Sequence, residues 1–312
     1  MPNPAANRDL SVITISITPF DDKGAVDEPA FRRHLQRLGA AGISVYIGGS
    51  GSGEGYSLTR EERDRILTIA VEELGGKVPV LADGVEPRTT RETLQFVRDI
   101  EPIHVDAVRI MPLDPGHGSK PNPAEIERFH RAVCESTSRP LILTSHQAAG
   151  YILPIDLVER LADRYSNIQG INYGGTDTTY LADLVKRLVG RMQVHCAGCT
   201  NGLTTLTLGG NGFMGNEGNF APTLVAAVLA AFKEGNAAAL KESFGKLMSL
   251  AAIVRKYGGS SLRGLKPMLN LFGVPGGTLR EPRLPLDRAE VEKMAKAVAE
   301  LQIPGAPRLQ TS

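Results

Sequence analysis

The chain has no tryptophan, only three cysteines and almost no net charge over its 312 residues. The cysteines are Cys134, Cys196 and Cys199. Three is a small and odd number, which argues against a disulfide framework. Lys and Arg number 35 against 34 Asp and Glu, which leaves a net charge of +1. Such a balance argues against nucleic acid or an anionic membrane as a partner. It leaves small neutral or weakly anionic molecules as the expected ligands.

Long apolar runs are also missing. No run approaches the roughly 18 to 20 residues that span a bilayer, and the opening MPNPAANRDL lacks the basic and apolar regions of a signal peptide. We therefore expect a cytoplasmic protein. Cys196 and Cys199 form a CxxC pair, but a single pair is weak evidence for zinc. The sequence predicts neither a metal nor an organic cofactor.

What the chain does contain is a regular alternation of short β-branched runs and segments with helical spacing. Alternation of this kind predicts a parallel sheet, and eight strands is the number that closes into a (β/α)8 barrel, the TIM barrel. A doubly wound open sheet is the alternative, disfavoured because no GxGxxG follows the first strand. The eight runs are SVITISIT, GISVYIG, KVPVLA, DAVRIMP, PLILTS, NIQGIN, QVHCAG and NGFMGN.

Four further segments with helical periodicity follow the eighth strand, and Gly235 separates the first from the other three. The first completes the barrel, so residues 1–234 are expected to form it. Residues 235–303 are predicted to form a helical extension packed on the barrel or on a partner subunit. The polar, proline-bearing residues 304–312 are expected to be a loose tail.

In a barrel of this kind the chemistry lies where the strands end. At the end of the second strand the run GISVYIGGSGSGEGYSLTREER resembles a signature of the dihydrodipicolinate synthase and N-acetylneuraminate lyase family. The similarity continues through SITPF, VDAVRIMP, SNIQGI and FMGNEGNFAP to GLKPMLNLFGVPGG, which covers nearly the whole chain. The matching residues of the signature are Ser52, Gly53, Glu54, Leu58, Thr59, Glu61, Glu62 and Arg63.

The resemblance implies a (β/α)8 barrel with a C-terminal helical extension, usually assembled as a homotetramer. It also implies chemistry on 2-oxo acids through a lysine Schiff base, with that lysine after a Gly-Ile pair on the sixth strand. Here Gly170 and Ile171 are followed by Asn172. A carboxamide nitrogen is delocalised and non-basic, so it cannot condense with a ketone to an iminium ion. The usual covalent mechanism is therefore not expected.

Other positions depart from the family pattern as well. A tyrosine of the fifth strand is matched by Leu143, and the arginine that holds the substrate carboxylate by Ala148. Leu113 and Asp114 stand in place of a tyrosine after the fourth strand, and Gly51 replaces a threonine of the glycine-rich loop. With the lysine replaced by Asn172, five family positions are lost. One engineered substitution cannot account for five losses, so the sequence indicates a divergent branch of the family with a different pocket.

Several polar residues remain at the strand ends. Ser52, with the backbone amides of Gly51 to Gly53, is suited to hold a carboxylate or carbonyl oxygen, although such a turn can also be purely structural. Glu54 is expected to anchor this loop. Asn172 should point into the barrel mouth and donate to a carbonyl or oxyanion, with a satisfied polar core residue as the alternative.

Proton transfer is assigned to His146 after the fifth strand, with Asp114 orienting it or accepting a proton. His117 is a weaker candidate. A metal site built from Glu54, Asp114, His146 and Glu217 is the less favoured alternative, because no HxH or HExxH spacing supports it. Tyr173 is adjacent to Asn172, but the strand period of two should turn it away.

These residues predict a lyase of aldolase or dehydratase type, acting on a small oxo or hydroxy acid by acid–base steps without a Schiff base. The alternative, from another class, is a ligand-binding or regulatory barrel that has lost catalysis. The polar and titratable residues that still end most strands favour the enzyme. Apolar runs in the extension, such as LMSLAAIV, and the family resemblance predict a homo-oligomer, either a dimer or a tetramer.

Overall fold

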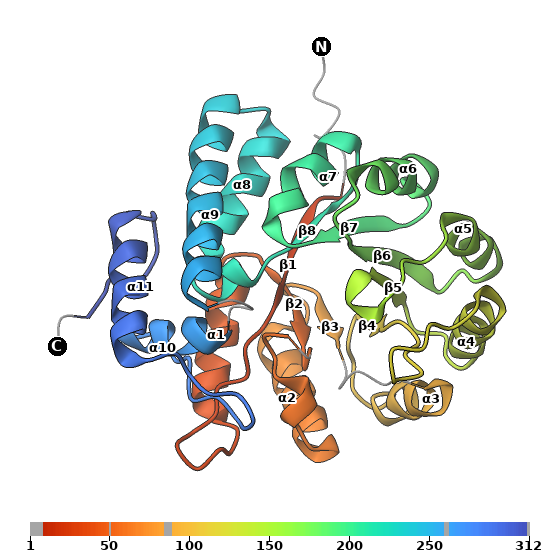
Figure 1. Ribbon diagram of the computed structural model, residues 1–312, viewed down its shortest axis with the longest axis horizontal. Helices are drawn as coiled ribbons and strands as arrows, with labels where there is room; N and C mark the ends of the chain where they lie inside the picture. Colours follow the sequence, from red (N-terminus) through yellow and green to blue (C-terminus); the bar gives the residue numbers. More distant parts are fainter. Residues whose placement is uncertain (1–8, 50, 84–88, 259–261, 311–312) are drawn as a thin grey trace.

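A computed structural model describes residues 9–49, 51–83, 89–258 and 262–310. Eight strands in these segments form one closed, all-parallel barrel in sequence order. Figure 1 labels the strands and the helices around them. The predicted (β/α)8 architecture is confirmed, and the doubly wound alternative is wrong. The strands are β1 (Ser11–Ile15), β2 (Ser44–Ile47), β3 (Val80–Ala82), β4 (Ala107–Ile110), β5 (Leu141–His146), β6 (Ile168–Gly174), β7 (Gln193–Ala197) and β8 (Gly212–Met214).

Helices follow the strands and form the outer layer, and several begin at residues whose side chains cap the helix. Asp27 accepts a hydrogen bond from the backbone of Ala30, while Thr59 and Asn122 each complete a capping box. The helices are α1 (Glu28–Ala40), α2 (Arg60–Leu74), α3 (Thr90–Asp99), α4 (Pro123–Glu135), α5 (Ile155–Arg164), α6 (Thr178–Leu188), α7 (Gly202–Leu208) and α8 (Pro222–Glu234). Single 3-10 turns, η1 (Gly55–Ser57), η2 (Gln147–Ala149), η3 (Cys199–Asn201) and η4 (Asn216–Asn219), lie after β2, β5, β7 and β8.

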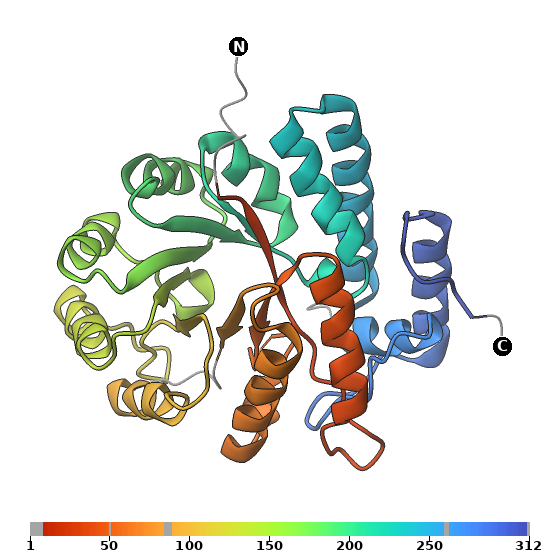
Figure 2. The same cartoon turned by 180° about the vertical axis from the view of Figure 1, so that it is seen from behind.

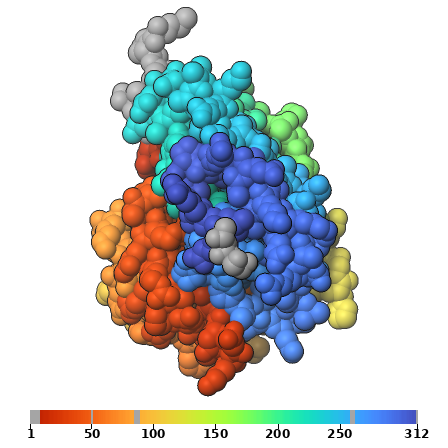
Figure 3. Space-filling model, turned by 90° about the vertical axis from the view of Figure 1, so that its left-hand side faces the viewer, coloured from red at the N-terminus to blue at the C-terminus, as the bar shows by residue number. Residues whose placement is uncertain are grey.

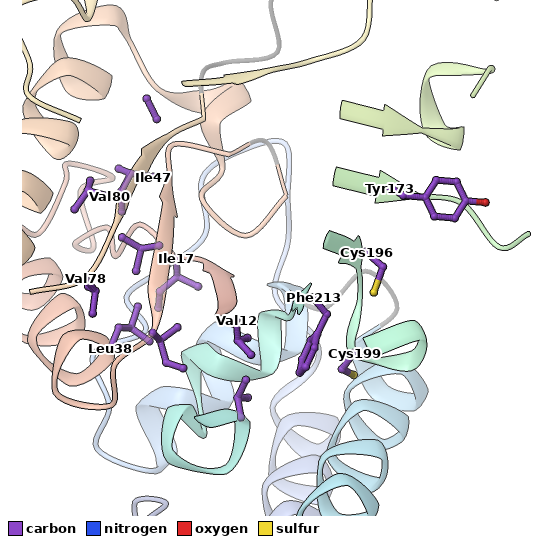
Figure 4. Packing of buried hydrophobic residues seen from close by; sticks show 14 of the residues in the cluster. Val12, Ile17, Leu38, Ile47, Val78, Val80, Tyr173, Cys196, Cys199 and Phe213 are labelled. Carbon is purple, nitrogen blue, oxygen red and sulfur yellow. The ribbon is translucent and has the colours of Figure 1, made fainter. Parts of the chain in front are cut away.

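The barrel wall separates two apolar clusters, because successive side chains of a strand point to opposite faces. The larger cluster lies between the wall and the helices and includes Val12, Tyr173, Cys196 and Phe213, which are labelled in Figure 4. The smaller cluster fills the barrel interior with Ile13, Tyr46, Leu81, Ala107 and Met214.

The C-terminal extension consists of α9 (Ala237–Gly258), α10 (Leu262–Leu271) and α11 (Arg288–Glu300), and we propose to place its boundary at Gly235. Helix α9 packs against α8, while α10 and α11 continue along one side of the barrel (Figures 1 and 2). Figure 3 shows this side, with the extension in blue beside the N-terminal helices.

The apolar run 247–254 of α9 is largely covered within the chain itself. Leu247, Leu250 and Val254 are buried, and Met248 and Ile253 are half-buried. The extension thus packs on its own barrel, one of the two predicted arrangements. These side chains no longer give a physical reason to expect a partner subunit, so the predicted homo-oligomer rests on the family resemblance.

Two hydrogen bonds anchor the described part of the C-terminal tail, residues 304–310. Thr223 Oγ1 donates to the carbonyl of Pro304 at 3.2 Å, and the amide of Gln310 donates to the carbonyl of Leu271 at 2.9 Å. The described part of the tail, which was expected to be loose, is therefore held against α8 and α10. Among the helices described, none is both long and apolar enough to cross a bilayer.

Candidate active site at the barrel mouth

Asn172 lies inside the barrel on β6, where the sequence predicted it, and is 1% exposed. Its Nδ2 donates to the hydroxyl of Tyr46 on β2 across the barrel, at 2.6 Å. In the described part of the chain its Oδ1 is buried and has no hydrogen-bond partner. One of the two donors of the amide is therefore already used, and the atom of Asn172 that has no partner is an acceptor.

A charged pair lies close to this contact. Nη1 of Arg109 on β4 is 2.7 Å from Oδ2 of Asp83 at the end of β3, and Nε of Arg109 donates to Oγ1 of Thr144 on β5. The guanidinium carbon lies 5.1 Å from the centroid of the Tyr46 ring. All four side chains are buried. A buried cation is tolerable here because a carboxylate and a hydroxyl satisfy its donors.

Sequence reasoning missed the roles of Tyr46, Arg109 and Thr144. Arg109 carries a signal in retrospect, since an arginine within the apolar strand run DAVRIMP must be paired or solvated. Its partner was not predictable, because Asp83 comes from another strand. Burial raises the pKa of Tyr46 strongly, with the Arg109 charge opposing, so the phenol that Asn172 contacts is neutral.

The glycine-rich loop after β2 is tightly folded. A Cβ on Gly53 would lie 2.8 Å from the backbone N and O of Gly49, and one on Gly55 would lie 2.0 Å from the carbonyl of Gly48. Gly51 is different, because it is exposed and an added Cβ would meet nothing within 4 Å. The loop therefore needs Gly53 and Gly55 for its shape, whereas Gly51 could carry a side chain.

Ser52 is 1% exposed, and in the described segments its Oγ has no hydrogen-bond partner. An unpaired buried hydroxyl costs about 1–3 kcal/mol. In the purely structural alternative, the Ser52 hydroxyl would cap the backbone of its own turn. The absence of a hydrogen bond from Oγ in the described residues does not match that alternative. The loop itself is fixed by Thr18, whose Oγ1 donates to the carbonyl of Gly53 at 2.8 Å.

Glu54 anchors the loop, as the sequence indicated. Its Oε2 lies 2.6 Å from Nζ of Lys266 on α10, and its Oε1 accepts from the backbone of Arg280 at 3.2 Å. Burial lowers the pKa of Lys266 to about 8, although the Glu54 carboxylate acts in the opposite direction. Glu54 is thus committed to the extension rather than to the metal site weighed as an alternative. Within the described ranges, no three His, Cys, Asp or Glu side chains are grouped to hold a metal ion.

His146 and Asn172 project from neighbouring strands toward the same side. In the register of β5 and β6, Thr144 pairs with Asn172 and His146 pairs with Gly174. His146 is therefore two residues beyond the level of Asn172, on the same inward face and nearer the mouth. A Cβ on Gly174 would come within 2.6 Å of His146 Nε2, so the ring lies directly over that glycine. Nδ1 accepts from the backbone of Ala148 at 3.0 Å, which places the ring proton on Nε2.

Asp114 lies in the loop after β4, where its Oδ1 accepts from the backbone of Gly116 at 2.9 Å. That loop is tied to the one after β5, because the Tyr151 hydroxyl donates to the carbonyl of Leu113 at 3.0 Å. The segments that carry Asp114 and His146 are therefore neighbours. His117, the weaker candidate, is exposed and has a φ of +51°.

The strand pleat corrects one assignment and confirms another. Leu143 belongs to the outer cluster, so it does not stand where a tyrosine would face the pocket; Thr144 does. A one-residue offset turned the predicted position to the wrong face. Tyr173 points outward as predicted (Figure 4). Its hydroxyl donates to the carbonyl of Asp177 at 3.0 Å and its ring stacks on Tyr180.

Comparison with known proteins identifies the scaffold. The sequence profile of the dihydrodipicolinate synthetase family matches residues 9–301. The chain belongs to this family. It is 31% identical over 297 residues to a protein of Pyrobaculum arsenaticum named only as a DapA-like lyase, covering 91% of this chain and 97% of that protein. It is 27% identical over 294 residues to the 4-hydroxy-tetrahydrodipicolinate synthase of Phocaeicola vulgatus, covering 92% and 95% of the two chains.

Solved structures agree with this membership. YagE, a prophage protein of the dihydrodipicolinic acid synthase family from Escherichia coli K12, solved in complex with pyruvate, superposes with a TM-score of 0.86 at 26% identity. The match covers 94% of this chain and 99% of YagE. A dihydrodipicolinate synthase from Bacillus anthracis, at 23% identity and a TM-score of 0.85 over 96% and 99% of the two chains, shows the same fold.

Proposed function

We propose that this family member is a lyase of aldolase or dehydratase type that acts on a small oxo or hydroxy acid without a lysine Schiff base. The observation that carries the proposal is Asn172. It occupies the position after Gly170 and Ile171 where the family resemblance implies the lysine, and it lies inside the barrel against Tyr46. Another lysine, Lys266, is buried, but its amine is held by Glu54 and by the carbonyl of Thr18.

Two buried polar atoms support a ligand with several oxygens. Ser52 Oγ can donate to a carboxylate at the glycine-rich loop, and Asn172 Oδ1 can accept from a hydroxyl deeper in the barrel. An atom left unpaired in this way is stabilised by roughly 1–3 kcal/mol when it gains a partner. The Arg109 cation, paired with Asp83, adds a fixed dipole beside the site.

Proton transfer falls to His146. In its neutral form, with the proton on Nε2, the ring can donate a hydrogen bond to a substrate oxygen. In its cationic form, which requires Nδ1 to give up the hydrogen bond from Ala148, Nε2 can protonate a leaving hydroxyl or alkoxide, and the neutral ring that remains can accept a proton at Nε2. Asp114, from the neighbouring loop, supplies a carboxylate that stabilises the cationic form of the ring. Acid–base steps of this kind suit dehydration, hydration, retro-aldol cleavage or isomerisation of a small acid.

A substrate screen tests this function. Small oxo, hydroxy and sugar acids are tested by thermal shift, and each compound that stabilises the protein is incubated with it and followed by proton NMR. We expect a hit that turns over, and a turnover rate reduced about 10²- to 10⁴-fold in His146→Asn, with Thr178→Ser as a surface control. If every compound that binds is left unchanged by the protein, the result would favour the non-catalytic barrel instead.

We also propose a cytoplasmic homo-oligomer, either a dimer or a tetramer. Assembly is supported by the family resemblance and location by the sequence alone, since the apolar run of α9 is covered within the chain. Light scattering at micromolar concentration tests the assembly, and a monomer of 33.4 kDa would contradict it.

A further inference from the structure

We propose that Tyr46 determines the ligand preference of this site: by holding Nδ2 of Asn172 it leaves the amide oxygen toward the ligand, which favours a hydroxy acid over the matching oxo acid. The inference rests on the proposed function, since it assumes that a small acid binds at the barrel mouth. It goes further by choosing between the two classes of acid that the function leaves open.

The two ends of a carboxamide differ in chemistry. The oxygen only accepts hydrogen bonds, whereas the nitrogen only donates them. In this barrel the nitrogen is used by the Tyr46 hydroxyl at 2.6 Å, and in the described residues the oxygen has no partner. A ligand hydroxyl can donate to that oxygen. A ketone oxygen cannot, because two acceptors brought together repel each other.

The Tyr46 side chain is held firmly in place. It is fully buried, and the Arg109 guanidinium lies 5.1 Å from its ring centroid. Arg109 is fixed in turn by Asp83 at 2.7 Å and by Thr144 at 3.1 Å. The phenol therefore cannot swing away to release the amide. The whole arrangement comes from five different strands or strand ends, which gives it the rigidity of the barrel wall.

A ketone oxygen could accept only from the second N–H of Nδ2, and Oδ1 would then stay buried without a partner. To present Nδ2 in place of Oδ1, the amide of Asn172 would have to rotate by half a turn and the Tyr46 hydroxyl would have to change from acceptor to donor. A ligand that leaves Oδ1 unpaired, or that needs these changes, should bind less tightly than one whose hydroxyl donates to Oδ1. The loss of one net hydrogen bond corresponds to a difference of about three- to tenfold in affinity.

Lactate and pyruvate form the matched pair for the test, because they differ only in having a hydroxyl or a carbonyl at the second carbon. Dissociation constants of both enantiomers of lactate and of pyruvate are measured by titration calorimetry. For the wild-type protein we expect one lactate enantiomer to bind about three- to tenfold more tightly than pyruvate. In Tyr46→Phe, which keeps the ring against Arg109, we expect the two affinities to come within about twofold.

Tyr173→Phe is the matched control. It removes a tyrosine hydroxyl from the opposite face of β6, where that hydroxyl bonds to Asp177 outside the barrel. The preference for lactate should be unchanged in this variant. If Tyr46→Phe does not fold, Asn172→Leu replaces it: this side chain has neither donor nor acceptor and should also abolish the preference.

The outcomes separate the two proposals. If the wild-type protein binds neither acid nor any other small acid in the screen, the proposed function fails and this inference fails with it. If the wild-type protein binds but prefers pyruvate, or if Tyr46→Phe keeps the full preference for lactate, the inference alone is overturned. A parallel loss of both affinities at constant ratio would show that Tyr46 is merely structural, and this too overturns it.

Discussion

Nζ of Lys266 lies 2.6 Å from Oε2 of Glu54, and both side chains are fully buried. The lysine comes from α10 of the extension and the glutamate from the glycine-rich loop that carries Ser52. Nζ also donates to the carbonyl of Thr18, and Thr18 in turn holds Gly53. The extension therefore does more than cover the barrel, since it fixes the shape of the loop expected to bind a carboxylate.

Removing Lys266 should strongly destabilise the protein. Lys266→Met leaves the Glu54 carboxylate buried without its cation, a situation that typically costs about 3–5 kcal/mol. Urea unfolding followed by circular dichroism measures the change. Lys293→Met removes an exposed ion pair with Glu290 and should leave the unfolding midpoint unchanged. Adding Glu54→Gln to Lys266→Met should recover part of the loss; an equally unstable double variant would contradict the ion-pair explanation.

Stability should fall in mild acid because three histidines are buried in the neutral form. Burial lowers the pKa of His34 to about 3, and of His130 and His195 to about 4. Below the ordinary value of 6.5 the unfolded chain takes up protons at these sites while the folded chain does not, so the free energy of unfolding decreases as the pH falls from about 6.5 toward 4. Each site contributes up to about 1.4 kcal/mol per pH unit in that window.

Thermal unfolding at pH values between 7 and 5 measures this dependence. His130→Phe removes one titrating ring that packs edge-on against Phe129, and it should make the pH dependence shallower. His117→Gln changes an exposed loop residue and should leave the dependence as it is. A melting temperature that is constant from pH 7 to 5 would show that these rings are not neutral in the folded state.

The fold was predictable because its signals are local and repeated. Each β-branched run is a strand, and residues such as Thr59 and Asn122 mark helix starts through their own capping boxes. Glu54 was correctly expected to anchor its loop, but its partner Lys266 lies 212 residues away. No local pattern carries a pairing of that kind, because it depends on how the extension packs on the barrel.

The interior of the site was less predictable for the same reason. Asn172 lies inside the barrel, yet one of its two donors is used by Tyr46, which comes from the far side of the barrel. Leu143 was matched to the family tyrosine of the fifth strand, but Thr144 is the residue that faces inward. A match made by counting residues along the sequence ignores the pleat of the strand. Strand-end residues can be read from a sequence; which of their atoms remain unpaired depends on several strands at once.

Restoring the family lysine should not restore family activity. In Asn172→Lys the new amine would lie beside Tyr46 and near the Arg109 cation, and burial and like charge would both favour its neutral, nucleophilic form, so the amine itself would not be the limit. Gly51, Thr144 and Ala148 would still lack the proton relay and the carboxylate clamp. Assays for dihydrodipicolinate synthase and sialic acid lyase activity should therefore stay near background. Rates near those of the family enzymes would show that these departures matter little.

The central claim is that this barrel does not use a Schiff base, and borohydride trapping tests it most directly. Wild-type protein is treated with borohydride in the presence of pyruvate, and its intact mass is compared with that of protein treated without pyruvate. Because Asn172 cannot form an iminium ion, we predict the same mass in both samples. A mass increase equal to one reduced pyruvyl group, on Lys266 or on any other lysine, would contradict the account.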